Sequence, residues 1–291
     1  MNMVGWQVHN CYALAIRSFF GKWVVAVEAV LVAMFFTGCS PKVEGPKDEV
    51  FEQTYDIEPE AGLSIRNTDG SIVIHGTETS ALKLRAIKRA KNSEELKDIN
   101  VITGAGEKAV SITTKFLPQK HRALSSGSRT VDYTIEVPLT VNLTRVDLDN
   151  GKVLIDGMRG EDLHATVVDG QLAIRNCCGN AQVSIANGAL DLYYEPCERK
   201  RFLVDAQMTN GNAGVFIGRG ASFRIQAETM TGKIINELAD MVNLNGRPTR
   251  KVDISTGKGV SQEIKLRVTT GDIKIAEGSY EAGSSRASPS R

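Results

Sequence analysis

The sequence predicts an all-β protein, a β-solenoid similar to a parallel β-helix, with one short helix near residues 93–99. Seven Asp/Asn/Thr-Gly pairs carry this prediction, because each is flanked on both sides by apolar residues that alternate with polar ones. Such alternation predicts strands with one buried face. Asp, Asn and Gly suit the turns because they reach positive φ at low cost. The seven pairs are Asp69-Gly70, Asn150-Gly151, Asp169-Gly170, Asn187-Gly188, Asn210-Gly211, Thr231-Gly232 and Thr270-Gly271.

The spacing of these pairs favours stacked strand-turn-strand units. From Gly151 the glycine-to-glycine intervals are 19, 18, 23, 21 and 39 residues, and the last is close to two units with Thr256-Gly257 between them. Equivalent positions at near-constant spacing can stack and build a continuous core, as in solenoids. A meander of type I′ hairpins would show the same local turns and is the alternative.

The segment 51–142 is less regular and is expected to be a β-rich opening to the same solenoid. Strand-like stretches cover 82–87, 99–102, 110–114 and 131–138. Between the first two, Ser93 is the expected N-cap of a short helix, with Glu94 and Glu95 in its first turn and Leu96 and Ile99 on its inner side.

The N-terminal residues 1–38 resemble an export signal. A 14-residue run from Trp23 to Phe36 is apolar except for Glu28, and Arg17 and Lys22 precede it. The run is short for a membrane span, which needs roughly 20 apolar residues, but suits the hydrophobic region of a signal peptide. An uncleaved anchor and secretion without a lipid are the alternatives.

The residues that follow the run resemble the lipobox of bacterial lipoproteins. Thr37, Gly38 and Cys39 match that motif, whereas Phe36 stands where Leu is usual. The resemblance implies that Cys39 is acylated, and Ser40 implies sorting to the outer membrane by the proteobacterial rule. Residues 39–50 are then a flexible tether, and residues 277–291, rich in Gly, Ser and Arg, a disordered tail.

The body, residues 51–276, resembles the bacterial putative-adhesin domains of unknown function, which are β-solenoid-like. The resemblance rests on Leu63-x-Ile65-x-Asn67-x-x-Gly70-x-Ile72-x-Ile74-x-Gly76, on Val131-x-Tyr133-x-Ile135-x-Val137-Pro138, and on the Asn-Gly and Thr-Gly units that follow. It implies adhesion at the cell surface or envelope and brings no catalytic residues. Some relatives look linked to envelope-stress systems.

Composition and motifs argue against nucleic-acid binding and give little support for an enzyme. The chain has 35 Lys+Arg against 34 Asp+Glu and 6% aromatic residues, whereas nucleic-acid binding needs a basic field and stacking platforms. No acidic row recurs three residues after the glycines, where a polysaccharide-active β-helix enzyme would need one. No cofactor motif is found. His75, His121 and His164 lack metal-ligand spacing, and Asp162 with His164 lacks a nucleophile. Acidic residues concentrated between 147 and 169 are either a divalent-cation patch or a solvated edge of turn residues: Asp147, Asp149, Asp156, Glu161, Asp162 and Asp169.

Three cysteines in the body have spacings that suggest a disulfide. Cys177 and Cys178 follow Gly170 by 7 and 8 residues, and Cys197 follows Gly188 by 9 residues. Stacked coils lie about 4.8 Å apart, within the Cα separation that a disulfide accepts. A Cys178–Cys197 bridge is the first expectation for an exported protein, and Cys177–Cys197 the alternative. One thiol remains, buried or available to a partner.

One residue after each glycine, outward polar side chains form a row that could meet an envelope glycan or protein: Lys152, Gln171, Asn212 and Lys233. The leading hypothesis is therefore a non-enzymatic, lipid-anchored envelope protein with a β-solenoid binding surface. The alternatives are an envelope scaffold or stress-response component without its own ligand and, third, a polysaccharide-active enzyme. The alternative interpretation of the row is a solvated face that binds no ligand.

Overall fold

The computed structural model describes residues 47–117, 129–198, 201–238, 249–257 and 262–278. Within them the protein is nearly all-β, with fifteen strands in one open sheet and one short helix. None of the described helical residues forms a segment long and apolar enough to cross a bilayer. The predicted signal peptide, Cys39 and most of the predicted tail lie outside the described residues.

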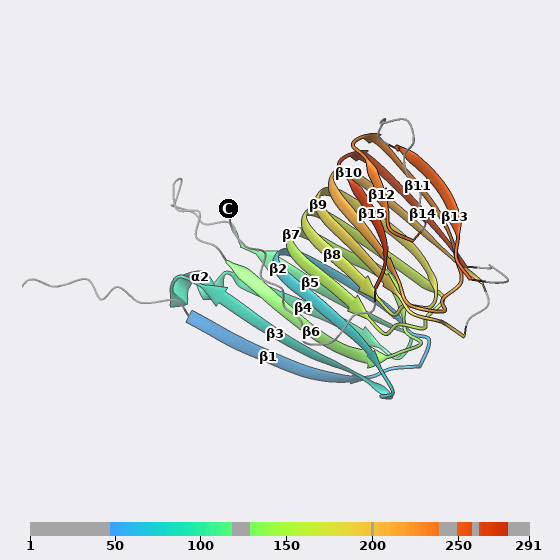
Figure 1. Ribbon diagram of the computed structural model, residues 1–291. Coiled ribbons are helices and arrows are strands. Elements are labelled where there is room, and N and C mark those ends of the chain that lie inside the picture. Colours follow the sequence, from blue (N-terminus) through green and yellow to red (C-terminus); the bar gives the residue numbers. More distant parts are fainter. Residues whose placement is uncertain (1–46, 118–128, 199–200, 239–248, 258–261, 279–291) are drawn as a thin grey trace, which may run out of the picture. The chain divides into compact units, whose positions relative to one another are not determined.

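Five long strands lie beside one another (Figure 1), and each carries one of the predicted Xaa-Gly pairs in its interior. They are β2 (Gly62–Thr77), β7 (Asn142–Asp156), β8 (Asp162–Arg175), β9 (Asn180–Tyr194) and β10 (Phe202–Ile217). The prediction of two strands joined by a turn is therefore corrected to one strand bent at its glycine. A type I′ turn needs positive φ at two successive residues, but only the glycine of each pair has it.

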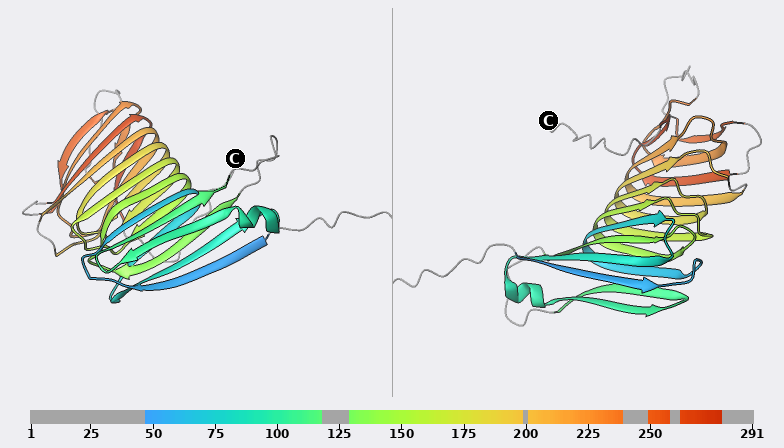
Figure 2. Two further views of the ribbon diagram at one scale, coloured as in Figure 1. Left: turned by 180° about the vertical axis from the view of Figure 1, so that it is seen from behind. Right: turned by 90° about the horizontal axis from the view of Figure 1, so that it is seen from below.

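The long strands pair in parallel and in register, which excludes the hairpin meander for these units (Figure 2). Their corner glycines face one another in the order Gly70, Gly151, Gly170, Gly188 and Gly211. At Gly151 φ is +132°, and a Cβ there would lie 1.8 Å from the carbonyl oxygen of Gly70. Both the backbone angle and the close approach of the neighbouring strand therefore require glycine.

Inward side chains from both halves of each bent strand belong to one hydrophobic core. In β7, Val146 and Leu148 precede the corner, Val153 and Ile155 follow it, and all four are buried. The pairing places each of them beside the equivalent residue of the next strand. Removal of these apolar side chains from water is the main stabilising contribution to the stacked strands.

The N-terminal strands continue the same sheet. They are β1 (Lys47–Asp56), β3 (Ala81–Ala90), β4 (Ile99–Gly106), β5 (Ala109–Phe116) and β6 (Thr130–Pro138). β5 and β6 pair in parallel with the two halves of β2, and β1 and β3 extend β6 in antiparallel pairs. The fully buried Asn67 donates from Nδ2 to the carbonyl oxygen of Val131 (2.8 Å), which holds β6 at the corner. β1 starts inside the segment predicted to be a tether, because its backbone pairs with β3.

The short helix α2 (Ser93–Lys97) lies where the sequence predicts it, but its N-cap is Asn92 and not Ser93. The side-chain oxygen of Asn92 accepts a hydrogen bond from the backbone N–H of Glu95 at 2.8 Å. Asn and Ser are about equally good N-caps, so their order in the sequence does not decide between them.

The last strands depart from sequential stacking. They are β11 (Phe223–Thr231), β12 (Ile234–Asn236), β13 (Lys251–Ser255), β14 (Gln262–Thr270) and β15 (Ile273–Glu277). β14 and β15 lie between β10 and the β11/β12 pair, so Gly271 precedes Gly232 in the stack. Thr256-Gly257 does not form the expected unit. It follows β13, which runs antiparallel beside β11 at the edge of the sheet.

Candidate binding surface

The predicted polar row lies exposed on the outer side of the strands, directly after the glycine corners. Lys152 of β7 and Gln171 of β8 face each other across neighbouring strands. Ala189 of β9 separates Gln171 from Asn212 of β10. The structure therefore brings the row onto one face but interrupts it with residues that the sequence analysis did not include.

At the C-terminal end of this row, the side chains bind neighbouring backbone. Oδ1 of Asn212 accepts a hydrogen bond from the backbone N–H of Asp272 at 3.0 Å. Oδ1 of Asp272 in turn accepts from the backbone N–H of Lys233 at 3.0 Å. Asp272 thus lies between two predicted row members, and these contacts fix the order of the last three corners.

A second row consists of the residues directly before the glycines, whose side chains form a hydrogen-bonded ladder. Nδ2 of Asn187 donates to Oδ1 of Asp169 at 2.8 Å, and Nδ2 of Asn210 donates to Oδ1 of Asn187 at 3.0 Å. At the N-terminal end of the ladder, burial raises the pKa of Asp69, opposed by a hydrogen bond from Asn150. Amide ladders of this kind stabilise stacked parallel strands.

A half-buried group of aromatic and charged side chains covers the second halves of β8, β9 and β10. The rings of Tyr193 and Phe216 stack with centroids 4.6 Å apart and planes 11° apart. The Arg175 guanidinium lies 5.6 Å from the Tyr193 ring centroid, within the range of a cation–π contact. Burial raises the pKa of Asp191 beside them, and the charge of Arg175 lowers it in part.

Sequence reasoning did not identify this group. Arg175, Tyr193 and Phe216 stand five residues after their corner glycines, whereas the predicted outward rows stood one and three residues after them. Asp191 lies three residues after Gly188, but the equivalent residues of the neighbouring strands, Ala173 and Gly214, are not acidic, so no acidic row forms. The pattern that could have identified this group is a large planar side chain five residues after the corner glycine in three successive strands.

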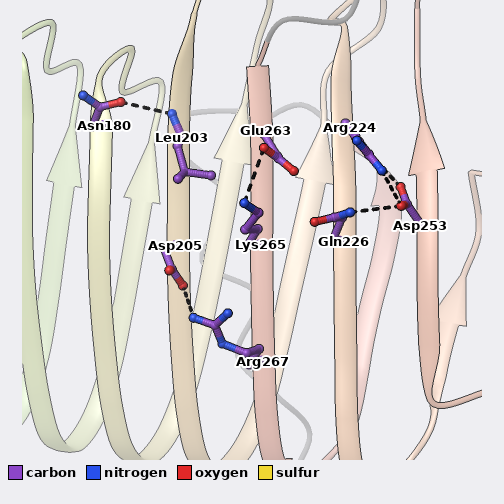
Figure 3. A network of polar contacts seen from close by, with 9 residues as sticks. All are labelled: Asn180, Leu203, Asp205, Arg224, Gln226, Asp253, Glu263, Lys265 and Arg267. Carbon is purple, nitrogen blue, oxygen red and sulfur yellow. Dashed lines mark hydrogen bonds and ion pairs between the residues drawn. The ribbon is translucent and has the colours of Figure 1, made fainter.

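A third group, of charged side chains, spans β10, β14, β11 and β13 (Figure 3). Arg267 pairs with Asp205 of β10 at 2.6 Å, and Arg224 pairs with Asp253 of β13 at 2.7 Å. Hydrogen bonds from Arg224, and then from Gln226, lower the pKa of Asp253 to about 2. These pairs lie where β14 is inserted between β10 and β11 and where β13 follows β11 at the edge of the sheet.

The acidic residues between 147 and 169 do not converge on a cation site. Asp147 pairs with Arg145, Asp162 accepts a hydrogen bond from Asn180, and Asp169 belongs to the amide ladder. In the part of the chain that the structure describes, no three His, Cys, Asp or Glu residues could together hold a metal ion. His164 is exposed on β8, and His121 lies outside the described residues.

The cysteines lie at the end of the strands away from the glycine corners. The structure joins Cys178 and Cys197, with Cα atoms 6.2 Å apart, beside a surface hollow that Arg159 and Glu161 also line. Cys177 is a buried free thiol, and burial raises its pKa to about 12. Its Sγ lies 3.2 Å from the backbone oxygen of Arg175.

Comparisons with known proteins identify structures of limited similarity. No protein-family model matches the sequence, and no curated protein matches it significantly. A putative cell adhesion protein from Clostridium sporogenes is 16% identical, with a TM-score of 0.49 over 80% of this chain and 100% of its own. A putative adhesin from Bacteroides fragilis is 12% identical, with a TM-score of 0.34 over 78% of this chain and 97% of its own. A putative adhesin from Parabacteroides merdae is 9% identical, with a TM-score of 0.20 over 77% and 96% of the two chains.

Proposed function

We propose that the protein is a non-enzymatic, lipid-anchored component of the bacterial envelope that uses a β-solenoid surface to bind another envelope component. The observation that carries this proposal is the in-register stack of bent parallel strands with glycine at every corner. Such a stack repeats outward positions at intervals of about 4.8 Å. It suits recognition of an extended partner, because many weak contacts can then act together.

Support for the anchor comes from the sequence. Cys39 follows a hydrophobic run and small residues, and the first described strand begins at Lys47. An acylated Cys39 would thus hold the folded unit close to a membrane surface, and Ser40 favours the outer membrane.

Support for a non-enzymatic role comes from how the charged groups are used. Asp169 lies in the amide ladder, Asp272 caps backbone, and Asp205 and Asp253 are in ion pairs. General acid–base catalysis needs titratable groups aimed at a shared substrate position. These carboxylates instead hold neighbouring strands together.

The first test is the intact mass of the protein extracted from native membranes, compared with a Cys39→Ser variant. We expect a mass for residues 39–291 plus acyl chains, and an unprocessed variant. Full-length, unacylated protein in the soluble fraction would contradict the lipid anchor.

The second test separates a binding protein from a scaffold without a ligand. The purified full chain is incubated with isolated cell envelopes, and the bound fraction is measured after sedimentation. We expect saturable binding that weakens in a Lys152→Glu, Gln171→Ala variant. The control is Thr166→Ala with Gln182→Ala, on the outer face of the strand halves before the corner. Absence of saturable binding would favour the scaffold, whereas saturable binding that both variants retain would place the binding surface away from this row.

A further inference from the structure

The second halves of β8, β9 and β10 present a compact outward patch, here called the β8–β10 patch. It contains three outward residues from each strand, aligned by the parallel register: Gln171, Ala173 and Arg175; Ala189, Asp191 and Tyr193; Asn212, Gly214 and Phe216. Gln171 and Asn212 are exposed, and the arginine, the carboxylate and both rings are half-buried. Next to the corners the patch thus carries exposed amides, and farther from the corners it carries half-buried, stacked planar groups.

The centre of the patch is a carboxylate with small neighbours on both sides. Asp191 faces Ala173 on one strand and Gly214 on the other. A Cβ at Gly214 would lie 2.8 Å from Oδ1 of Asp191 and 2.5 Å from a ring carbon of Phe216. Glycine therefore leaves the room into which the carboxylate and the ring extend.

The planar groups form one side of the patch. Arg175, Tyr193 and Phe216 stack across three successive strands, with the ring centroids 4.6 Å apart and the guanidinium 5.6 Å from the Tyr193 centroid. Stacked planar groups offer apolar C–H surface, and the arginine adds hydrogen-bond donors at the end of the stack.

We propose that the β8–β10 patch binds a pyranose unit of a neutral, linear polysaccharide that runs across the strands. The proposal rests on the proposed function and names the ligand class. A sugar ring needs apolar contact for its C–H face and both donors and acceptors for its hydroxyl groups, and the aromatic rings, Asp191 and the two carboxamides supply them. Arg175 and Asp191 balance in charge within the patch, so a neutral sugar unit is favoured there over a phosphate group or a basic side chain.

The direction of the polymer follows from the rows on either side of the patch. The row one residue after the corner glycines continues to Lys152 of β7 and, through Asp272, to Lys233. With Ala189 it has six positions, which span roughly 24 Å at about 4.8 Å per step. A chain of several sugar units along this row would place one unit over Ala189 and beside Asp191, so affinity should rise with chain length.

The test is calorimetric titration of the detergent-purified full chain with chitotetraose, cellotetraose and their disaccharides. We expect at least one tetrasaccharide to bind, with more than tenfold higher affinity than its disaccharide. Asp191→Asn and Tyr193→Ala should each weaken binding at least tenfold. The matched controls, Gln182→Ala and Thr166→Ala on β9 and β8 before the corner, should leave it unchanged.

A stability measurement separates recognition from folding. Asp191→Asn keeps the size of the side chain and removes a charge that burial disfavours, so its melting temperature should not fall while its binding does. The proposal is overturned if neither tetrasaccharide binds, or if Asp191→Asn and Tyr193→Ala bind as the wild type does. An acylated protein that binds envelopes but no tetrasaccharide would overturn this ligand class and leave the proposed function standing. An unacylated protein that binds the tetrasaccharide would do the reverse.

Discussion

The middle and the C-terminal end of the sheet are held in register by different means. In the middle, β7 to β10 stack in sequence order, and outward residues before the corners such as Thr166, Gln182 and Ser184 are exposed and uncharged. At the end, β14 lies between β10 and β11, and ion pairs cross the strands there. The strands that stack in sequence order are thus aligned by glycine corners and apolar rows. The insertion of β14 coincides instead with ion pairs between strands.

This difference has a physical reason. A strand that follows its neighbour in the chain is directed beside it by a short connection and a matching corner. β14 instead pairs with both β10 and β11 after a longer connection, and apolar alternation alone is similar on all the strands of the stack. The diagonal ion pair between Arg267 and Asp205, and Asp272 between Asn212 and Lys233, distinguish this position from the others.

The largest effect is expected from a side chain at a middle corner. In Gly170→Ala the new Cβ would lie 1.9 Å from the carbonyl oxygen of Gly151, and φ is +155°. We expect a loss of about 4 kcal/mol or more in the free energy of unfolding, or failure to fold, because the neighbouring strand must move. Urea denaturation followed by circular dichroism measures it.

Gly220→Ala is the matched control for that corner. Gly220 also has positive φ, +85°, but a Cβ there would meet no atom within 4 Å. Its expected cost is only that of the backbone conformation, about 1–2 kcal/mol. Equal losses of unfolding free energy in the two variants would show that the close approach of the neighbouring strand is not the reason why the corner requires glycine.

Next in size is the disulfide, which ties the loops after β8 and β9 to each other. Cys178 and Cys197 are 19 residues apart. Replacing both by serine should lower the free energy of unfolding by about 3 kcal/mol, because the unfolded chain regains the freedom of that loop. Chemical denaturation with and without reductant checks the value, and the double variant should not respond to reductant.

Cys177, the body cysteine outside the disulfide, should not react with a thiol reagent in the folded protein. Its thiol is buried and burial raises its pKa to about 12, so it carries almost no thiolate at pH 8. Iodoacetamide should leave it unmodified in the folded protein and label it in urea. Rapid labelling of the native protein would contradict the burial of this thiol.

The sequence predicts local features well and long-range order poorly. The corner glycines, the inward residues and the region of the short helix follow from alternation and turn chemistry, because these depend on neighbours in the chain. Thr256-Gly257 looks like another corner, but β13 runs antiparallel at an edge, which only pairing with β11 decides. The β8–β10 patch was missed because Arg175, Tyr193 and Phe216 come together only when three strands stack.

A charge exchange tests whether ion pairs select the position of β14. Arg267→Glu should cost about 1 kcal/mol at low salt, because it places two carboxylates together, and adding Asp205→Arg should recover most of it. Both side chains are partly exposed, so the difference should shrink as salt rises. Thermal denaturation of the wild type, both single variants and the double variant gives the coupling. Additive effects would mean that the pair does not help to position the strand.

The smallest effect concerns Asp191, in the middle of the sheet. Burial raises its pKa above the ordinary value of 3.8, so the protonated carboxyl favours the folded state. Its stabilising effect is therefore complete below pH 3.8 and is lost as pH rises through the folded-state pKa. Compared with Asp191→Asn, the wild type should lose stability over that range, by no more than a surface substitution does, about 0.5 kcal/mol. Melting temperatures of both proteins between pH 3 and pH 7 measure the difference, and a gain of the wild type over the variant with rising pH would contradict it. Ion pairing lowers the pKa of Asp253 to about 2, so Asp253 should still be ionised in most of this range. The pH dependence of the middle strands can therefore be distinguished from that of the C-terminal end.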